Sequence, residues 1–372
     1  MENKTKILFT ASRVSHFTQF HTPYLKYYYD KGYEIHTAAQ GTAVFDFPLI
    51  QHELVFDKKR PLKNLKGIFL IRKLVKENQI DIIISNATLA GAVTRAGLLF
   101  LRKRPVVIHS CHGYLFSKNT KPLKKLLLVS AEKFFSCITD LVITMNREDY
   151  EAAKKYKFCK NIVNIPGIGI QPHKMTAATG ETIRSRYNIP KDAVLLTYAA
   201  EFSARKNQES LIRLLEPVLA KNETVYVILA GTGACYEHCR ELVKEKRLEN
   251  RILIPGYVNN MQEVLEETNI VISASKSEGL PFNIMEAMCS GIPVIASRIK
   301  GHEDLIIDGE TGFLFSLENN EEFDNKLHKL ITDKNLYEKF SEESKKRSNL
   351  FTLDSVFNSV TNAYAIADKR LL

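Results

Sequence analysis

The sequence predicts an α/β protein with two doubly wound parallel sheets, that is, two Rossmann-like domains facing each other across a cleft. Three observations lead to this class. Short apolar, β-branched runs alternate with amphipathic segments along the chain, the alternation pauses once near the middle and then restarts, and 372 residues suit about two domains. Strands separated by helices of this length need right-handed crossovers, which build parallel sheets covered on both faces.

The first domain is expected to span residues 1–170. Its strand-like runs are KILFT (6–10), YEIHTAA (33–39), ELVF (53–56), DIIISN (81–86), PVVIHS (105–110), DLVITM (140–145) and NIVNIP (161–166). Amphipathic patterns between these runs predict helices, for example over residues 64–77 and 122–136. Glycine, proline and polar residues then break the pattern and predict a linker over residues 171–185.

The second domain is expected to span residues 186–350. Its strand-like runs are VLLTYAA (194–200), TVYVILAG (224–231), RILIPG (251–256), NIVISAS (269–275) and PVIAS (293–297). The remaining residues, 351–372, are predicted to form a helix that crosses back to the first domain. Ligands of open parallel sheets bind beyond the carboxyl ends of the strands, so the loops after these strands are where a site is expected.

Composition excludes several classes of protein. The chain is 45% hydrophobic and 25% charged, it has no run of the roughly 18 apolar residues that a membrane span needs, and its charged N-terminus is unlike a signal peptide. Six scattered cysteines form no CxxC pair and no zinc-ligand spacing. Reduced thiols, and hence a cytoplasmic protein, are the expectation.

Charge is divided unequally between the two halves. Residues 1–174 hold 28 Lys and Arg against 13 Asp and Glu, a net charge of +15, whereas residues 175–372 have a net charge of −5. Such asymmetry predicts that the first half meets a polyanion or an anionic membrane surface.

Four successive loops of the second domain carry residues suited to an anionic ligand. Arg205 and Lys206 follow the first strand of this domain, and Gly231 and Gly233 follow the second. The loop after the third strand carries Tyr257 and Val258, and the loop after the fourth carries Glu278. An isolated Arg-Lys pair is more often a solvated surface feature, and GTG alone is weak evidence for a ligand. Convergence of all four loops at one edge of a sheet favours a binding site.

The stretch SEGLPFNIMEAMCSGIPVIAS (277–297) adds a helix start to this edge. Pro281 suits the first helical turn, where its missing N–H has no cost, and the N–H groups of a helix N-terminus favour phosphate. Arg205 and Lys206 would bring a planar fork and a point charge to the same diphosphate. Glu286 could accept hydrogen bonds from two ribose hydroxyls, so the pattern fits a nucleoside diphosphate.

The segments Glu278-GLPFNIM-Glu286, AMCSGIPVIAS and DGETGFLF (308–315) resemble glycosyltransferase family 4 (glycosyl transferases group 1), retaining enzymes of the GT-B fold whose signature is two glutamates separated by seven residues. The resemblance covers most of the second domain and extends more weakly through the first. It implies an acceptor-binding first domain and a donor-binding second domain. It also implies that His112, in HSCHGYLF (109–116), contacts the transferred sugar.

The resemblance assigns residues to each part of the donor: the sugar, the diphosphate and the ribose. Glu278 would lie at the sugar, Arg205 and Lys206 at the diphosphate, and Glu286 at the ribose. The catalytic set would be His112, Arg205, Lys206 and Glu278, and the donor-binding set Arg205, Lys206, Gly231, Gly233, Tyr257, Val258, Glu278, Gly279, Leu280, Pro281, Phe282 and Glu286.

Two departures from the family pattern stand out. Many relatives have an arginine five positions before the phosphate lysine, but Glu201 stands here, so Arg205 would substitute. The loop TASRVSHFTQFHTPY (10–24) lacks the usual glycine pair, which leaves Ser15, His16 and His21 as acceptor-site candidates.

The sequence contains no DxD motif, so neither a metal ion nor another cofactor is expected. Protein cations and helix dipoles would stabilise the leaving diphosphate instead. No strong nucleophile is evident near the donor, which favours front-face attack, with the departing phosphate oxygen accepting the proton of the acceptor. His112 would then position and stabilise the sugar, or be simply a structural histidine.

Residues 117–136, SKNTKPLKKLLLVSAEKFFS, interleave lysines with leucines and phenylalanines, as basic amphipathic helices at membrane surfaces do. A packed helix with a solvated lysine face is the alternative. The same half holds further basic residues: Arg60, Lys63, Lys66, Arg72, Lys73 and those of the segment 101–104. Together they favour peripheral attachment to the inner face of the cell membrane, with Lys121, Lys124 and Lys125 among the contacts. A nucleic-acid partner is not expected, because no recognised nucleic-acid module accompanies the charge.

The predicted function is transfer of a hexosyl or N-acetylhexosaminyl group from a nucleotide sugar, such as a UDP-N-acetylhexosamine, to a lipid-linked saccharide. The product would be a capsule, exopolysaccharide or O-antigen. Two alternatives remain open: a nucleotide-sugar epimerase on the same fold, and a non-catalytic sugar-nucleotide-binding partner.

Overall fold

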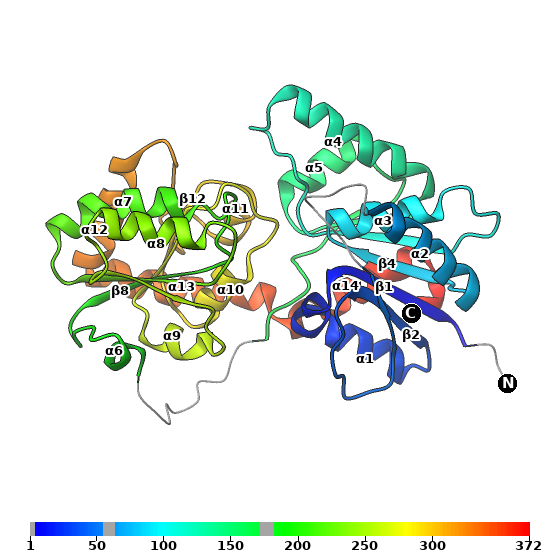
Figure 1. Cartoon of the computed structure of the whole chain (residues 1–372), viewed down its shortest axis with the longest axis horizontal. Helices are drawn as coiled ribbons and strands as arrows, with labels where there is room; N and C mark the ends of the chain where they lie inside the picture. The colour runs from blue at the N-terminus through cyan, green and yellow to red at the C-terminus, as the bar shows by residue number, and fades with distance from the viewer. Residues whose placement is uncertain (1–3, 55–63, 172–181) are drawn as a thin grey trace. The chain divides into compact units, whose positions relative to one another are not determined.

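The computed structural model describes residues 4–54, 64–171 and 182–372 (Figure 1). The chain divides into two compact units. The first consists of Met1–Gly169 together with Leu353–Leu372, and the second of Ile170–Thr352. The expected linker, 171–185, lies mostly outside the described residues, as do Arg60 and Lys63. The six cysteines are all free thiols.

Within its described part, the first unit has a seven-stranded parallel sheet in the order β3-β2-β1-β4-β5-β6-β7. The strands are β1 (Lys6–Arg13), β2 (Glu34–Gln40), β3 (Ile50–Glu53), β4 (Ile82–Asn86), β5 (Val106–Cys111), β6 (Leu141–Thr144) and β7 (Ile162–Asn164). The central strand β4 is buried along its whole length, as a parallel strand covered on both faces should be.

Helices cover both faces of this sheet: α1 (Thr22–Asp30), α2 (Asn64–Asn78), α3 (Thr88–Leu98), α4 (Pro122–Phe135), α5 (Arg147–Tyr156) and α14 (Leu353–Ala367). Residues of α2 and α3 share a core with Leu8, Ile83 and Val107 on one face. On the other face, α14 lies against β5, β6 and α1 (Figure 1). The Phe357 ring of α14 stacks on the Tyr24 ring of α1, with ring centroids 5.0 Å apart. The C-terminal helix is therefore part of the first unit.

The second unit repeats this plan with six parallel strands in the order β10-β9-β8-β11-β12-β13 among the residues described. They are β8 (Val194–Ala199), β9 (Val225–Ala230), β10 (Ile252–Gly256), β11 (Ile270–Ser273), β12 (Val294–Ser297) and β13 (Phe313–Phe315). The helices are α6 (Ile183–Arg186), α7 (Gln208–Lys221), α8 (Tyr236–Glu245), α9 (Met261–Glu267), α10 (Phe282–Cys289), α11 (His302–Leu305), α12 (Asn320–Thr332) and α13 (Lys334–Ser348).

Three clusters of buried apolar residues hold this second sheet, one of them formed by α10 with β11 and β12. Residues of α7, α8 and α12 fill one face, and residues of α6 and α9 pack with Leu195 and Ile228 on the other (Figure 1). The predicted fold class, two parallel-sheet Rossmann-like domains, is confirmed.

The third strand begins earlier than predicted. The apolar run 53–56 was expected to form it, but β3 is Ile50–Glu53, Leu54 lies outside it, and residues 55 and 56 are not among those described. Within the described part of the chain β3 pairs with β2 alone, at the edge of the sheet, and Gln51 and His52 remain partly exposed. Because an edge strand need not be apolar, the hydrophobic pattern did not indicate its first three residues.

Helix α4 is held to the first unit by a buried ion pair. The Arg95 guanidinium of α3 donates to both Glu132 carboxylate oxygens, at 2.9 and 3.1 Å, and stacks on the Phe135 ring 4.8 Å away. Glu132 is the buried residue of α4, whereas Leu123, Leu126, Leu127 and Phe134 are exposed. This ion pair, together with the packing of Leu128, Val129 and Phe135 against the buried cores, therefore fixes the helix.

We expect Glu132→Gln to destabilise the first unit by about 3–5 kcal/mol, because the buried Arg95 charge would lose its partner. The transition of this unit in urea, followed by circular dichroism, measures the loss. The matched control is Glu77→Gln, which removes the exposed ion pair with Lys73 at 3.7 Å and should change stability by less than about 1 kcal/mol. Equal effects of the two substitutions would contradict the role given to Arg95 and Glu132.

Candidate functional site

The candidate site of the second unit lies where β8 and β11 pair at the centre of the sheet. The chain leaves these neighbouring strands toward opposite halves of the sheet, which makes their carboxyl edge the topological switch point. The loop after β8 carries Arg205 and Lys206, and the loop after β11 carries Glu278. A hydrogen bond from Lys276 N to Arg205 O joins the two loops at 2.8 Å.

These three predicted residues meet. Lys206 Nζ lies 2.7 Å from Glu278 Oε1, and Arg205 donates to Glu278 Oε2, also at 2.7 Å. Glu278 is 7% exposed, whereas the Arg205 side chain is 46% exposed. The carboxylate thus forms the floor of a cationic site whose outer member is open to solvent.

Burial by itself would raise the pKa of Glu278, but the charges of Lys206 and then Arg205 outweigh it and lower the pKa to about 2. Ser275 Oγ adds a hydrogen bond to Oε1 at 2.6 Å. Both carboxylate oxygens are therefore engaged, and Glu278 is ionised at neutral pH. A carboxylate held in this way positions cations rather than attacking a substrate.

Sequence reasoning missed the residues beneath this site. Tyr198, on β8, hydrogen-bonds Ser275 Oγ at 2.7 Å and donates to Lys206 O at 3.0 Å. Ser297 Oγ donates to Ser275 O, and His302 is fully buried with Nδ1 2.7 Å from Ser297 O. The only signal in the sequence was that Ser275 and Ser297 stand at or just after strand ends.

The predicted donor glycines make close backbone contacts. Gly231 has φ +136°, and a Cβ there would lie 2.0 Å from Ala200 O; a Cβ on Gly233, at φ +153°, would lie 2.3 Å from Phe202 O. These glycines therefore let the loop after β9 lie against the loop that carries Arg205 and Lys206. The close contact observed at both glycines is therefore with the neighbouring loop.

The other donor candidates lie on two segments. Gly279 and Leu280 follow Glu278, and Pro281 immediately precedes α10 instead of opening its first turn; Phe282 begins this helix and Glu286 is half-buried within it. Asn283, which the sequence did not suggest, donates to Ala199 O at 3.1 Å and ties the start of α10 to β8. Tyr257 (69% exposed) and Val258 follow β10 at the sheet edge, two strands from β8.

In the first unit the acceptor candidates form a histidine cluster. A short π-helical turn, Phe17–His21, follows β1, and its i→i+5 hydrogen bonding brings residues five apart together. His16 Nε2 and His21 Nε2 lie 3.2 Å apart. His112, after β5, joins them, with ring centroids 4.7 Å from His16 and 5.8 Å from His21.

Burial lowers the pKa of all three histidines, that of His16 to about 4. Repulsion from His16 lowers the pKa of His21 and of His112 further. These imidazoles are therefore neutral at pH 7. Ser15 is exposed, and its carbonyl accepts from Thr18 Oγ1 at 3.3 Å.

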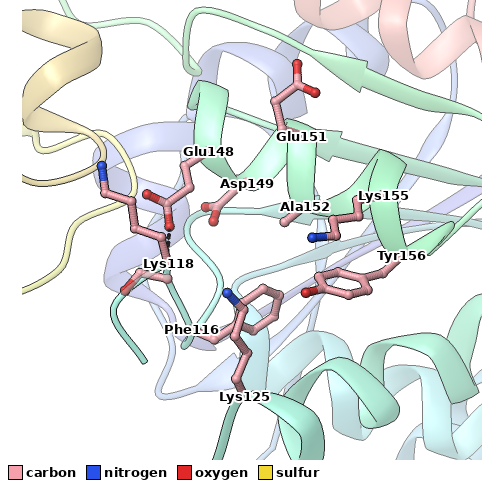
Figure 2. Close-up of a pocket in the computed structure, with 10 residues that line it drawn as sticks. Phe116, Lys118, Lys125, Glu148, Asp149, Glu151, Ala152, Lys155 and Tyr156 are labelled. Atoms are coloured by element: carbon pink, nitrogen blue, oxygen red, sulfur yellow. Dashed lines mark hydrogen bonds between the residues drawn. The ribbon is translucent and has the colours of Figure 1, made fainter. Parts of the chain in front are cut away.

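The basic residues of the first unit are not equivalent. Arg104 pairs with Asp140 at 2.6 and 2.8 Å, Arg72 donates to Leu99 O, and Lys133 donates to Lys157 O. Lys121 and Lys124 are exposed on α4. Lys125 instead borders a cavity of about 170 Å³ between the start of α4 and α5, which it lines with Lys118, Lys155 and Glu148 (Figure 2).

Comparison with known proteins supports the family to which the sequence motifs pointed. Residues 24–167 match the family described as Glycosyltransferase Family 4, and residues 180–347 match Glycosyl transferases group 1. The chain belongs to glycosyltransferase family 4. Together the two matches place both units in this family, and the chain is a glycosyltransferase.

Similar proteins and solved structures agree with this family assignment. EpsD of Bacillus subtilis (strain 168), itself only inferred to be a glycosyltransferase, is 27% identical over 97% of this chain and 96% of its own length. The UDP-Gal:alpha-D-GlcNAc-diphosphoundecaprenol alpha-1,3-galactosyltransferase of Escherichia coli is 25% identical over 73% of this chain and 72% of its own. Anabaena Alr3699/HepE, crystallised with UDP and glucose, superposes with a TM-score of 0.78 at 18% identity, covering 97% and 99% of the two chains, which shows the GT-B fold.

Glu278 should make the stability of the second unit depend on pH. Its pKa in the folded protein, about 2, lies below the ordinary value of 4.5, so its contribution is complete above pH 4.5 and is lost as the pH falls toward 2. A difference of this size corresponds to about 3 kcal/mol. We therefore expect Glu278→Gln to lower the unfolding free energy above pH 4.5 and to approach the wild type near pH 2.

Urea unfolding at a series of pH values measures this difference. Glu245→Gln, at an exposed position of α8, is the matched control and should follow the wild type throughout. A gap between Glu278→Gln and the wild type that stays constant from pH 6 to pH 2 would show that the carboxylate charge is not what stabilises the fold.

Proposed function

We propose that this glycosyltransferase transfers a hexosyl or N-acetylhexosaminyl group, with retention of anomeric configuration, from a UDP-sugar to a lipid-linked saccharide during synthesis of a cell-surface polysaccharide. The observation that carries the proposal is the meeting of Arg205, Lys206 and Glu278 at the switch point of the second unit. Two cations held by one buried carboxylate form a preorganised site for a diphosphate.

The UDP-sugar is supported by the relatives. The Escherichia coli galactosyltransferase is named for a UDP-galactose donor and a GlcNAc-diphosphoundecaprenol acceptor, and Alr3699/HepE was crystallised with UDP. The O-antigen glycosyltransferase WbnH, 27% identical over 77% of this chain, supports a role in polysaccharide synthesis. Glu286 would accept from the ribose hydroxyls, and Tyr257 and Val258 would lie near the base.

The cations explain how the chemistry proceeds. As the bond to the diphosphate breaks, negative charge grows on the phosphate, and Lys206 and Arg205 stabilise it without reorganising. Glu278 is fully engaged with these cations and with Ser275, so it is not the nucleophile. Front-face attack follows, in which the leaving phosphate oxygen takes the acceptor's proton. This chemistry needs no metal ion at the diphosphate, and His112 would position the transferred sugar.

An epimerase on the same fold is the second candidate. It would convert the nucleotide sugar without any acceptor, so incubation with the donor alone separates the two functions. A non-catalytic sugar-nucleotide-binding protein would give neither product. Transfer that requires the acceptor supports the proposed function.

Lys206→Ala should weaken UDP binding by about 1.5–3 kcal/mol, the value of a charge-assisted contact, or roughly ten- to a hundredfold in Kd. Isothermal titration calorimetry measures this. Lys244→Ala, an exposed lysine on α8, is the control and should bind as the wild type does. Unchanged UDP affinity in a folded Lys206→Ala variant would contradict the proposal that Lys206 binds the diphosphate.

We also propose that the first unit docks on an anionic membrane surface through α4. What favours docking over a packed helix with a solvated lysine face is that apolar side chains are also in solvent: Leu123 is 71% and Phe134 58% exposed beside exposed Lys121 and Lys124. Apolar side chains beside lysines suit the boundary between headgroups and acyl chains. None of the described helices combines the length and apolar character that a membrane crossing requires.

Reversing Lys121 and Lys124 to glutamate should weaken binding to anionic vesicles at least about tenfold, because each lysine contributes about 1 kcal/mol near such a surface. Leu126→Ser with Leu127→Ser should weaken binding without changing charge. Vesicle sedimentation measures both, with Lys329→Glu and Lys334→Glu in the second unit as the control pair. Equal sedimentation of all variants would exclude α4 as the docking face, whereas UDP binding should be normal throughout.

A further inference from the structure

Three histidines of the first unit are arranged as ligands around one point. His16, His21 and His112 each offer an imidazole nitrogen, and these nitrogens lie within 4.8 Å of one another. They come from two loops, after β1 and after β5, on strands that both pair with β4. The sheet therefore brings together residues about 90 positions apart in the chain, and all three are within one unit.

The spacing is close to that of a tetrahedral metal site. Metal–nitrogen bonds of about 2.0–2.1 Å place two imidazole nitrogens about 3.4 Å apart. The His16 and His21 Nε2 atoms, 3.2 Å apart, already match this value. At most one proton fits between these two atoms, so at least one of these nitrogens is unprotonated and carries a lone pair that an ion could take in place of that proton.

A neighbouring amide fixes the third imidazole. Asn86 Nδ2 donates to Ile84 O at 3.4 Å, which turns Asn86 Oδ1 toward His112 Nε2 at 3.3 Å. Since Oδ1 can only accept, Nε2 carries the proton of His112 and Nδ1 carries the lone pair. A ligating histidine whose second nitrogen donates to a neighbouring oxygen is the usual arrangement around protein-bound metals.

Burial fixes which nitrogen His21 can offer. His21 is fully buried and meets His16 through Nε2, so Nε2 is the atom that it would present to an ion. Its Nδ1 has no hydrogen-bond partner among the described residues and lies on the other side of the ring. His16 and His112 are half-buried and border solvent, which gives an ion a way in.

We propose that His16, His21 and His112 bind a borderline transition-metal ion of the Zn²⁺ class. Neutral imidazoles suit Zn²⁺, Co²⁺, Ni²⁺ and Cu²⁺, whereas Mg²⁺ and Ca²⁺ prefer oxygen ligands. The three side chains leave a fourth position for water. Since the three nitrogens lie within 4.8 Å of one another and a tetrahedral ion needs about 3.4 Å, His112 would move closer to the other two rings when an ion binds.

The proposed metal site is distinct from the proposed diphosphate site of the second unit. It includes His112, however, and the proposed function has His112 position the transferred sugar. One imidazole cannot serve both, so a bound ion opposes transfer. In this respect alone the inference rests on the proposed function. Removal of metal with EDTA should leave transfer intact, whereas added Zn²⁺ should inhibit it.

The test is a Co²⁺ titration of untagged, metal-free protein without donor or acceptor. We expect one equivalent to give the visible absorption of tetrahedral Co²⁺, one equivalent of Zn²⁺ to abolish it, and excess Mg²⁺ to leave it unchanged. His16→Gln and His112→Asn should each weaken Co²⁺ binding at least tenfold. His328→Ala, an exposed histidine of α12, is the matched control and should bind as the wild type does.

Asn86 supplies a finer readout. Asn86→Ala should weaken Co²⁺ binding about ten- to a hundredfold, and Asn86→Asp, which keeps an acceptor for His112, should restore it. Variants are compared only where their melting temperature matches the wild type. Absence of stoichiometric Co²⁺ absorption, or equal binding by the histidine variants and the His328→Ala control, would overturn the site. Tight Co²⁺ binding without inhibition by Zn²⁺ would support the site and contradict the role of His112 in transfer.

Discussion

A buried carboxylate that must be paired organises the second unit. Glu278 is almost removed from water, and an unpaired charge there would be very costly, so Arg205 and Lys206 have to reach it from the neighbouring loop. The two loops can meet only because β8 and β11 are adjacent and parallel. Gly301 permits the same approach from β12, since a Cβ there would lie 2.5 Å from Gly279 O. The site and the fold at this edge therefore depend on one another.

The first unit also contains a buried ion pair, but this pair lies beneath a helix whose outer side chains are exposed. The buried pair of Arg95 and Glu132 fixes α4 from beneath, together with the half-buried Leu128, Val129 and Phe135. Leu123, Leu126 and Leu127 remain in solvent beside lysines. A helix anchored along one side in this way can present further apolar side chains to a partner.

The loop after β1 departs from the expected family pattern and has a distinct local structure. In place of the glycine pair that the family resemblance led us to expect, the described structure has a π-helical turn, Phe17–His21, with His16 immediately before it. Such turns recur at functional sites. In this protein the turn brings two imidazoles beside His112, and the cluster gives the first unit a chemistry that the donor-binding residues of the second unit do not share.

The sequence alone determined the two parallel sheets, most strand positions, the family and the trio of Arg205, Lys206 and Glu278. It could do so because buried parallel strands are continuous apolar runs and because the loops after such strands share one edge. It could not place β3, since an edge strand tolerates polar residues such as Gln51. Nor could it separate the paired Arg104 and Lys133 from the exposed Lys121 and Lys124, or find Tyr198, Ser275, Asn86 and His302 beside the site residues. Those facts depend on contacts between residues far apart in the chain, which only the tertiary structure decides.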